Sequence, residues 1–373
     1  MQGFSLKDQL FNTDSVGDLA AELAGGVPGF EAAAFHAEVM SGLSERELLE
    51  RLEWIADCVA RQLSDDFPTL AAQLEAAMPP ALDPGRSDDD FGRFIHAVPG
   101  VLAVRCGIED HRERALDLLY EATKRFSMEF YIRPFLNRWP EETLTRLIQW
   151  ADDPNYHVRR LVSEGTRPKL PWAKKIDLDP EVPLQLLDAL HADGTRYVTR
   201  SVANHLNDIA KIKPRMVTDT LVKWRDAGQQ APEELQWMTR HALRTLVKQG
   251  NPDALGILGY RYGAPVQLKR LSLARDQLVP GEALEIEIEL MADMHCPVLV
   301  DYQIWFQKKN GSTAPKVFKL KQAVVTPEKA LIVKKRHVLK GNATTFTLHS
   351  GAHRVAVQVN GRVLGDVGFD LLT

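Results

Sequence analysis

Regular breaks in a long helical pattern constrain the fold of this chain more than any other feature. From Ser5 to about Gly259, apolar residues recur three and four positions apart, and Gly, Pro and Asp interrupt the pattern. The sequences Asp-Asp-Pro-Asn at 152–155 and Gly-Asn-Pro-Asp at 250–253 occupy similar positions between helices. Each helix pair of this kind exposes an apolar face that only the next pair can cover. The sequence therefore predicts a mainly α domain over residues 1–262, a HEAT-like α-solenoid with a concave surface.

The pattern changes to strands after Ala264. Leu284 to Leu290 alternates strictly between apolar and acidic residues, as a half-buried strand does, and an Asn-Gly hairpin signal lies at 310–311. Further strands are predicted at Val298–Phe306, Ala330–Val338, Thr344–Leu348 and His353–Val359. Six to eight strands in about 110 residues fit an all-β immunoglobulin-like sandwich over residues 265–373.

The bulk composition excludes several classes of protein. Three cysteines, Cys58, Cys106 and Cys296, lie far apart, and neither they nor the histidines have the spacing of a disulfide framework or a metal site. No segment has the eighteen or so apolar residues of a transmembrane helix, and the first residues do not resemble a secretory signal. We therefore expect a cytoplasmic protein that needs no metal or other cofactor and does not bind membranes.

Charge is distributed unevenly along the chain. The net charge of −4 and the pI near 6.3 do not indicate a nucleic-acid partner. Between Asn155 and Arg225, however, thirteen Lys and Arg residues face eight Asp and Glu residues. A local basic excess inside an acidic chain steers phosphate groups more effectively than the total charge indicates.

The segment Asn155–Trp172 concentrates the residues of greatest chemical interest. Its apolar residues repeat at helical spacing, so we expect Arg159, Arg160 and Glu164 to share the polar surface of a helix. Glu164 follows Arg160 by four residues, where the cation keeps the carboxylate ionised. Glycine and prolines then end the helix and leave Trp172 on a short rigid loop. Cations, an acid and an aromatic ring together suit a nucleic-acid partner.

The helix predicted at Tyr197–Lys211 has a similar composition. Arg200, Asn204, Asp208 and Lys211 fall outside its apolar stripe. Because Asn and Asp are poor helix formers, their presence in a helix interior is weak evidence for a functional role. A solvated face with a few local hydrogen bonds is the alternative.

Four segments carry a resemblance to a known family. They are KDQLFN at 7–12, EFYIRPFL at 129–136, NYHVRRLVSEGTRPKLPW at 155–172 and RYVTRSVANHLNDIAKIKP at 196–214. Together they make the helical region resemble the AlkC branch of the AlkD-like DNA alkylation repair glycosylases. Some AlkC-like proteins carry an immunoglobulin-like domain after the helices, which matches residues 265–373.

The resemblance implies an activity and a partner. It implies a monofunctional, bacterial DNA glycosylase of base excision repair that removes 3-methyladenine and 3-methylcytosine without base flipping. The partner would be double-stranded DNA containing alkylated bases at the nucleoid. No obligate protein partner is implied, and a monomer is the default expectation.

Three carboxylates are candidates for the catalytic group. A cationic base is already a good leaving group, so the remaining task is to stabilise positive charge on the sugar and to orient a water. Glu121, Glu164 and Asp208 are the candidates, and a helix-surface ion pair is the alternative role of Glu121. Glu164 is favoured because its motif is the most specific and Arg160 keeps it charged.

A further group of residues is expected to bind DNA. Basic side chains contact phosphates, which supply affinity without sequence information, and an electron-rich ring attracts a cationic base. Trp172 is either such a ring or a loop anchor packed between helices, and Tyr156 is more typical of core. The candidates are Tyr156, Arg159, Arg160, Arg167, Lys169, Trp172, Arg200, Asn204 and Lys211.

Other functions are compatible with the same architecture. A HEAT-repeat array can be a non-catalytic scaffold, and a lesion sensor would keep the binding surface without excision. In the sandwich, lysines cluster around the hairpin at 310–311 and in the predicted strand at 330–338. We hypothesise that this basic edge grips the DNA backbone, with a lysine-guarded sheet edge as the alternative.

Overall fold

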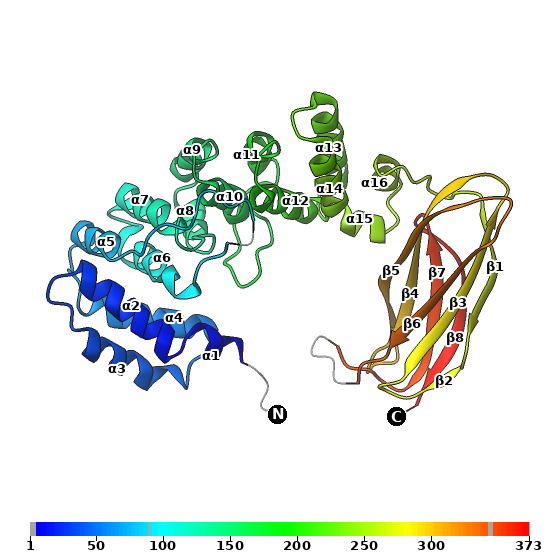
Figure 1. The fold of residues 1–373 in the computed structure, drawn as a ribbon, viewed down its shortest axis with the longest axis horizontal. Coiled ribbons are helices and arrows are strands. Elements are labelled where there is room, and N and C mark those ends of the chain that lie inside the picture. Colours follow the sequence, from blue (N-terminus) through cyan, green and yellow to red (C-terminus); the bar gives the residue numbers. More distant parts are fainter. Residues whose placement is uncertain (1–4, 89, 342–345, 373) are drawn as a thin grey trace. The chain divides into compact units, whose positions relative to one another are not determined.

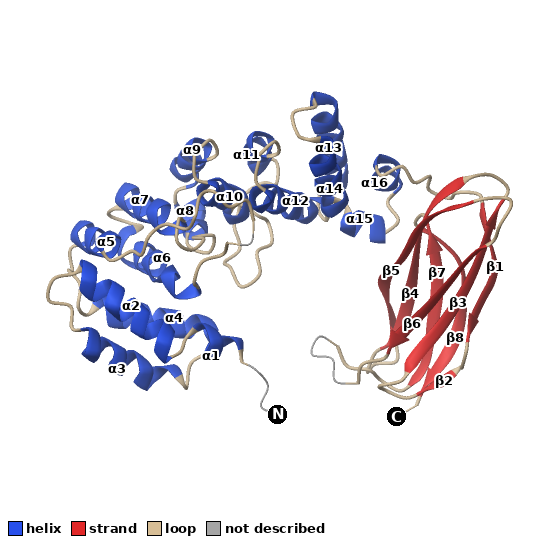
Figure 2. Cartoon of the chain, in the orientation of Figure 1, coloured by secondary structure: helices blue, strands red, loops and turns tan. Residues whose placement is uncertain are grey.

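The computed structural model describes residues 5–88, 90–341 and 346–372, and it shows helices followed by a β-sandwich (Figures 1 and 2). Chain contacts divide it into two units. One unit contains Met1–Ile209 and Trp224–His241, and the other contains Ala210–Lys223 and Ala242–Thr373. The predicted fold class is confirmed. The change from helices to strands lies between Ile257 and Val266, and the domain division at 262–265 stays a prediction.

The helical part is a succession of short helices. Their bounds are α1 Leu6–Leu10, α2 Thr13–Gly26, α3 Ala32–Leu43, α4 Leu48–Ala60, α5 Phe67–Ala76, α6 Val98–Leu102, α7 Arg112–Thr123, α8 Ile132–Arg138, α9 Pro140–Trp150, α10 Tyr156–Gly165, α11 Val182–Leu190, α12 Arg196–Ala210, α13 Pro214–Ala227, α14 Pro232–Ala242, α15 Arg244–Lys248 and α16 Pro252–Ile257. A 3-10 turn, η1 (Phe94–Ala97), precedes α6, and a π-helical turn, η2 (Ala103–Gly107), follows it.

Prolines and capping residues determine where several helices begin. Pro140, Pro214, Pro232 and Pro252 are the first residues of α9, α13, α14 and α16, a position where the missing N–H costs nothing. Asn155 caps α10 by accepting a hydrogen bond from the backbone of the second helical residue. Four of the prolines that interrupt the helical pattern therefore mark helix N-termini.

The predicted apolar stripes form the core of the helical unit. Val158, Leu161 and Val162 of α10 are fully buried, as are Val198 and Val202 of α12. Burial of these apolar stripes fixes the orientation of α10 and α12 in the helical unit.

Eight strands of the sandwich lie within the described residues. They are β1 Val266–Leu273, β2 Gln277–Leu278, β3 Ala283–Ala292, β4 Cys296–Gln307, β5 Thr313–Val325, β6 Leu331–Val338, β7 Gly351–Val359 and β8 Arg362–Leu371. One sheet has the order β1-β3-β6 and the other β2-β8-β7-β4-β5. Alternating apolar residues of β3 point into the core, and the predicted hairpin joins β4 to β5, with Gly311 at a φ of 78°.

One strand prediction is wrong and several strands were missed. Residues 346–348 of the strand predicted at Thr344–Leu348 are irregular, and 344–345 lie outside the described residues. The sequence did not indicate β1, β2 or β8, and for β5 it indicated only the hairpin that precedes the strand. The β5 strand lies at the edge of its sheet, where many of its residues are exposed. The alternation of apolar and polar residues is weak in such a strand, because burial does not require apolar side chains on one of its two faces.

The last two helices are part of the same unit as the sandwich. Gln358 donates to the carbonyl of Lys248 (3.4 Å), and Asn360 donates to the carbonyl of Arg261 (3.0 Å). Gly250 and Gly361 also approach so closely that a Cβ on Gly250 would lie 2.6 Å from the Gly361 backbone. Both glycines also have positive φ. The close approach of the two backbones and the positive φ therefore both favour glycine at these positions. Among the described residues, no helix has the length and apolar character needed to cross a bilayer.

Candidate active site

Helix α10 places Glu164 inside the protein, against expectation. The helical spacing was expected to leave Glu164 on the polar surface, but the residue is only 5% exposed. The neighbouring Ser163 is also buried, because α12 covers this face of α10. The position of Glu164 on the polar surface was therefore a wrong prediction, since periodicity cannot identify a polar face covered by another helix.

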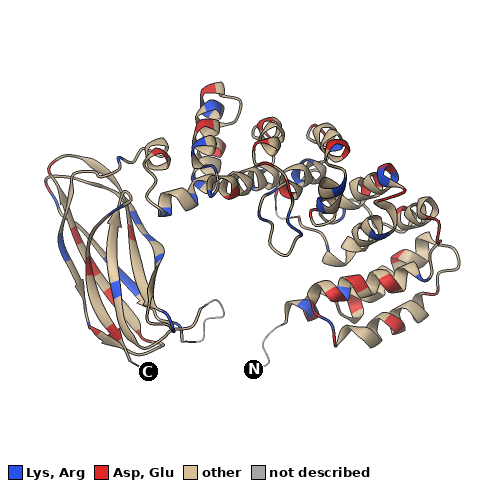
Figure 3. Ribbon diagram, turned by 180° about the vertical axis from the view of Figure 1, so that it is seen from behind, with Lys and Arg blue, Asp and Glu red and all other residues tan. Residues whose placement is uncertain are grey.

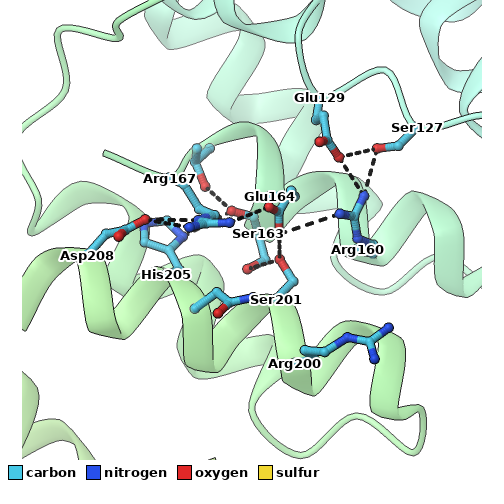
Figure 4. Close-up of polar contacts among 12 residues, drawn as sticks. Ser127, Glu129, Arg160, Ser163, Glu164, Arg167, Arg200, Ser201, His205 and Asp208 are labelled. Carbon is cyan, nitrogen blue, oxygen red and sulfur yellow. Dashed lines mark hydrogen bonds and ion pairs between the residues drawn. The ribbon is translucent and has the colours of Figure 1, made fainter. Parts of the chain in front are cut away.

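Glu164 receives hydrogen bonds on both carboxylate oxygens (Figure 4). Arg167 Nη1 donates to Oε1 over 2.5 Å, and Ser201 Oγ donates to Oε2 over 2.6 Å. Arg160 Nη2 lies 3.7 Å from Oε2, which confirms that Arg160 lies close to Glu164. Each oxygen keeps a further lone pair that can accept a hydrogen bond from a water or a substrate.

Arg167 links Glu164 to Asp208. Its Nε and Nη2 donate to Asp208 Oδ2 over 3.0 and 2.8 Å, while Nη1 contacts Glu164. Asp208 is 3% exposed. Two of the three candidate carboxylates, which are 44 positions apart in the sequence, therefore meet at one guanidinium.

Arg160 adds a carboxylate that the sequence analysis did not single out. Its Nη1 donates to Glu129 Oε2 over 2.6 Å and to Ser127 Oγ over 2.9 Å. The only sequence signal for Glu129 was its place at the start of the EFYIRPFL segment. We call Glu129, Arg160, Glu164, Arg167 and Asp208 the Glu164 cluster.

Glu164 and Arg160 keep their charges despite burial. Burial alone would raise the pKa of Glu164, but Arg160, Arg167 and the Ser201 hydrogen bond outweigh it and hold the pKa below its usual value. Burial likewise opposes the charge on Arg160, but Glu129 and Glu164 raise the pKa of Arg160 above its usual value. The site therefore contains an ionised carboxylate in a largely dry environment at neutral pH.

Three polar residues of α12 face α10. Ser201 bonds Glu164, His205 Nδ1 lies 3.0 Å from the Ser163 carbonyl, and Asp208 bonds Arg167. Their spacing of i, i+4 and i+7 is that of a buried helix stripe. This polar stripe is the sequence signal that distinguishes the buried polar face of α12 from a solvated face.

Arg133 of α8 positions the loop after α10. It donates to the carbonyls of Lys174 (2.5 Å), Gly165 (3.0 Å) and Arg167 (2.8 Å). Burial, together with the nearby charge of Arg167, lowers the pKa of Arg133 to about 10. One carbonyl from the end of α10 and two from the loop after it thus converge on one buried cation.

Trp172 lies on that loop and faces solvent. It is 67% exposed and has a φ of 64°, which is rare for a bulky residue. A loop anchor packed between helices would be buried, so that alternative is wrong. Trp172 borders a pocket of about 300 Å³. Other residues that line the pocket include Val101, Val104, Phe130, Tyr131 and Lys174.

Glu121, Arg159 and Arg200 make contacts outside the Glu164 cluster. Glu121 on α7 pairs with Lys124 (2.8 Å) and Arg125 (3.3 Å), and its side chain is 39% exposed. Arg159 pairs with Asp193 over 2.5 Å. Arg200 pairs with Asp88, and Figure 4 shows its side chain directed away from Glu164.

The other candidates are dispersed. Tyr156 is buried and packs against the rings of His157 and Tyr197, as expected of a core residue. The amide oxygen of Asn204 lies 2.8 Å from His241 Nε2. Lys211 follows the last residue of α12 and is exposed, as Lys169 is on the loop after α10. In the part of the chain that the structure describes, no three His, Cys, Asp or Glu residues form a group able to hold a metal ion.

Two buried histidines predict a loss of stability in acid. Burial lowers the pKa values of His157 and His205 to about 4, from 6.5. Both are neutral when folded and take up protons on unfolding, so stability is lost as the pH falls from 6.5 towards 4. When the pH falls from 7 to 5, we expect the free energy of unfolding of the helical unit to decrease by about 2 kcal/mol for each of the two histidines. Urea unfolding followed by tryptophan fluorescence measures this loss.

The variant His205→Gln should remove about half of that pH dependence. Glu164 does not contribute in this window, because its lowered pKa acts only below the usual glutamate range. Asp301 in the sandwich has a pKa raised to about 6 by burial, and its effect has the opposite sign. Tryptophan fluorescence separates the two, because six of the seven tryptophans precede residue 242. An equal slope in His205→Gln would contradict the assignment.

Comparisons with known proteins agree with this architecture. The family model described as "Uncharacterised protein YhaZ, C-terminal Ig-like domain" matches residues 267–373. YhaZ of Bacillus subtilis (strain 168) is 34% identical over 264 residues, which cover 70% of this chain and 72% of YhaZ.

A solved structure covers the complete chain. It is the Pseudomonas fluorescens alkylpurine DNA glycosylase AlkC bound to DNA containing an abasic site analog. The identity is 31% and the TM-score 0.89, over 99% of this chain and 100% of that chain. The chain therefore belongs to the family of AlkC and YhaZ, whose helical domain is followed by a C-terminal immunoglobulin-like domain.

Proposed function

We propose that this protein is a monofunctional DNA glycosylase that hydrolyses the N-glycosidic bond of cationic N3-methylated bases. The substrates are 3-methyladenine and 3-methylcytosine in double-stranded DNA, and the base is removed without flipping. The observation that carries the proposal is the Glu164 cluster, in which the buried Glu164 carboxylate is kept ionised beside a loop that exposes Trp172. The likeness to AlkC, whose structure contains DNA, supports it.

The chemistry requires little of the protein beyond charge and position. The methylated base leaves with the electron pair of the glycosidic bond and becomes neutral, so it needs no general acid. Positive charge develops at C1′ of the sugar, where an ionised carboxylate stabilises it. A water then adds to C1′ and gives its proton to a carboxylate. Glu164 is the preferred group, because two arginines and a serine hold it charged.

Exposed aromatic and basic residues complete the proposal. The ring of Trp172 attracts the cationic base, an interaction worth about 0.5 to 2 kcal/mol. Lys316, Lys319 and Lys321 of β5, with Lys334 and Lys335 of β6, have the charge needed to contact DNA phosphates (Figure 3). The alternative, a sheet edge that lysines protect from aggregation, accounts for the same residues.

Base release from a defined duplex tests the function. The wild-type protein, in excess over a duplex with one 3-methyladenine or one 3-methylcytosine, should release the free base and leave an abasic site. An undamaged duplex of the same sequence is the control, and a reaction without protein corrects for spontaneous loss. Binding without release would identify a lesion sensor. Neither binding nor release by folded protein would favour a scaffold.

A further inference from the structure

Ser201 of α12 occupies a special position beside Glu164. It is 2% exposed, and its Oγ lies 2.6 Å from Glu164 Oε2 and 2.9 Å from Ser163 Oγ. Arg160 Nη2 is farther from the same carboxylate oxygen, at 3.7 Å. Ser201 therefore makes the shorter polar contact with Oε2.

The number of protons that each group can donate determines the direction of this chain of hydrogen bonds. An ionised carboxylate only accepts, so the single hydroxyl proton of Ser201 is donated to Glu164. The contact between the two serines then requires Ser163 to donate to Ser201. Each bond in such a chain polarises the next, which strengthens the bond to the carboxylate. The chain crosses from α10 to α12 and returns, so it also couples the two helices.

We infer that Ser201 is a positioning residue, which holds the Glu164 carboxylate in its reactive orientation through the chain Ser163–Ser201–Glu164. The inference rests on the proposed function. Rotation of the carboxylate would break the Ser201 bond at Oε2 and the Arg167 bond at Oε1 together. The two donors come from different elements, so the plane of the carboxylate is fixed relative to both α12 and the loop after α10.

The charged and titratable groups around Glu164 determine what Ser201 adds. They come from α10, the loop after it, α12, the segment before α8 and α8 itself, and they are Arg160, Arg167, Tyr197, His205, Asp208, Glu129 and Arg133. His205 is neutral above about pH 4, and the arginines stay charged throughout the working range. Removal of the Ser201 donor therefore acts on the protonation of Glu164 rather than on that of its neighbours.

The variant Ser201→Ala tests the inference through its pH–rate profile. Hydrogen bonds to charged groups are strong enough that their loss should move the acid limb of single-turnover base release upward by about one to two pH units. As the pH is lowered, the rate of Ser201→Ala should begin to fall at a pH where the wild-type rate is still constant. DNA affinity should remain within about threefold, because Ser201 is buried. Ser201→Thr keeps the hydroxyl and should restore the wild-type profile.

A matched control separates positioning from packing. Thr143 of α9 is also fully buried, but its hydroxyl bonds the backbone carbonyl of Trp139. Thr143→Val should lower stability without moving the acid limb. If Ser201→Ala lowers the rate by one constant factor at every pH, its role is structural and the inference is wrong.

The failure of the function and the failure of this inference have different signatures. A wild-type protein that releases no base would count against the proposed function alone. The pKa of the Glu164 carboxyl is then measured directly by NMR on ¹³C-glutamate-labelled protein, with Glu164→Gln assigning the signal. A rise in Ser201→Ala would support the hydrogen-bond chain, and an unchanged pKa would overturn it.

Discussion

Glu164→Gln should lower single-turnover release of 3-methyladenine or 3-methylcytosine by about 10²- to 10³-fold. The amide has nearly the same shape as the carboxylate, but it has no negative charge for the oxocarbenium-like sugar. The rate is measured with protein in excess over the damaged duplex, so that it reports chemistry and not product release. DNA binding, followed by fluorescence anisotropy, should be retained.

Glu121→Gln is the control for this experiment. Glu121 is half-exposed and pairs only with neighbours on its own helix and the turn that follows it in the described contacts. Such exposed ion pairs contribute little to stability, so the rate of base release by Glu121→Gln should stay within about twofold of the wild-type rate. Full activity in Glu164→Gln, with loss in Asp208→Asn or Glu129→Gln, would transfer the role to that carboxylate of the Glu164 cluster.

Arg167→Met should destabilise the helical unit by about 3–5 kcal/mol. The guanidinium satisfies Glu164 and Asp208 at once, and all three side chains are largely buried. Methionine fills much of the same volume but leaves two carboxylates close together without their shared cation. One of them must then take up a proton or draw in water. Urea unfolding at pH 7, monitored by tryptophan fluorescence, measures the loss.

Arg105→Met is the matched control for Arg167→Met. Arg105 also links two carboxylates, those of Glu53 and Asp57, but it lies on the surface with its side chain 36% exposed. Solvent already screens these pairs, so the change should cost less than about 1 kcal/mol. Equal losses in the two variants would show that burial does not determine the strength of the Arg167 bridge.

The order of the helices and the nature of the second domain could be predicted because they depend on local patterns. Prolines at Pro140 and Pro252 start helices by their own geometry, and the stripe of Val158, Leu161 and Val162 is visible at helical spacing. The hairpin at Asn310-Gly311 follows from the φ values that its turn requires. Strand β5 could not be predicted in the same way, because an edge strand with many exposed residues lacks strict alternation.

The candidate site was predicted only in its parts. Glu164, Arg160, Asp208 and Trp172 were named from their segments, but sequence spacing placed Glu164 on the surface and left Glu121 equal to Asp208. Glu129 was missed, because a single carboxylate at the start of a segment has no distinguishing pattern. Its role depends on Arg160, which lies 31 residues later in the chain.

The sequence by itself determined that a helical region is followed by a region of strands, because propensity, capping and periodicity act between near neighbours. It also determined the chemical types available in each segment. Only the tertiary structure decided which charges meet. Packing of α12 on α10 buries Ser201 and Asp208 against Glu164 and Arg167, and burial makes these contacts strong. The same residue types can form an exposed ion pair or a buried network. The two differ in how far water screens the charges, and only the tertiary structure determines this.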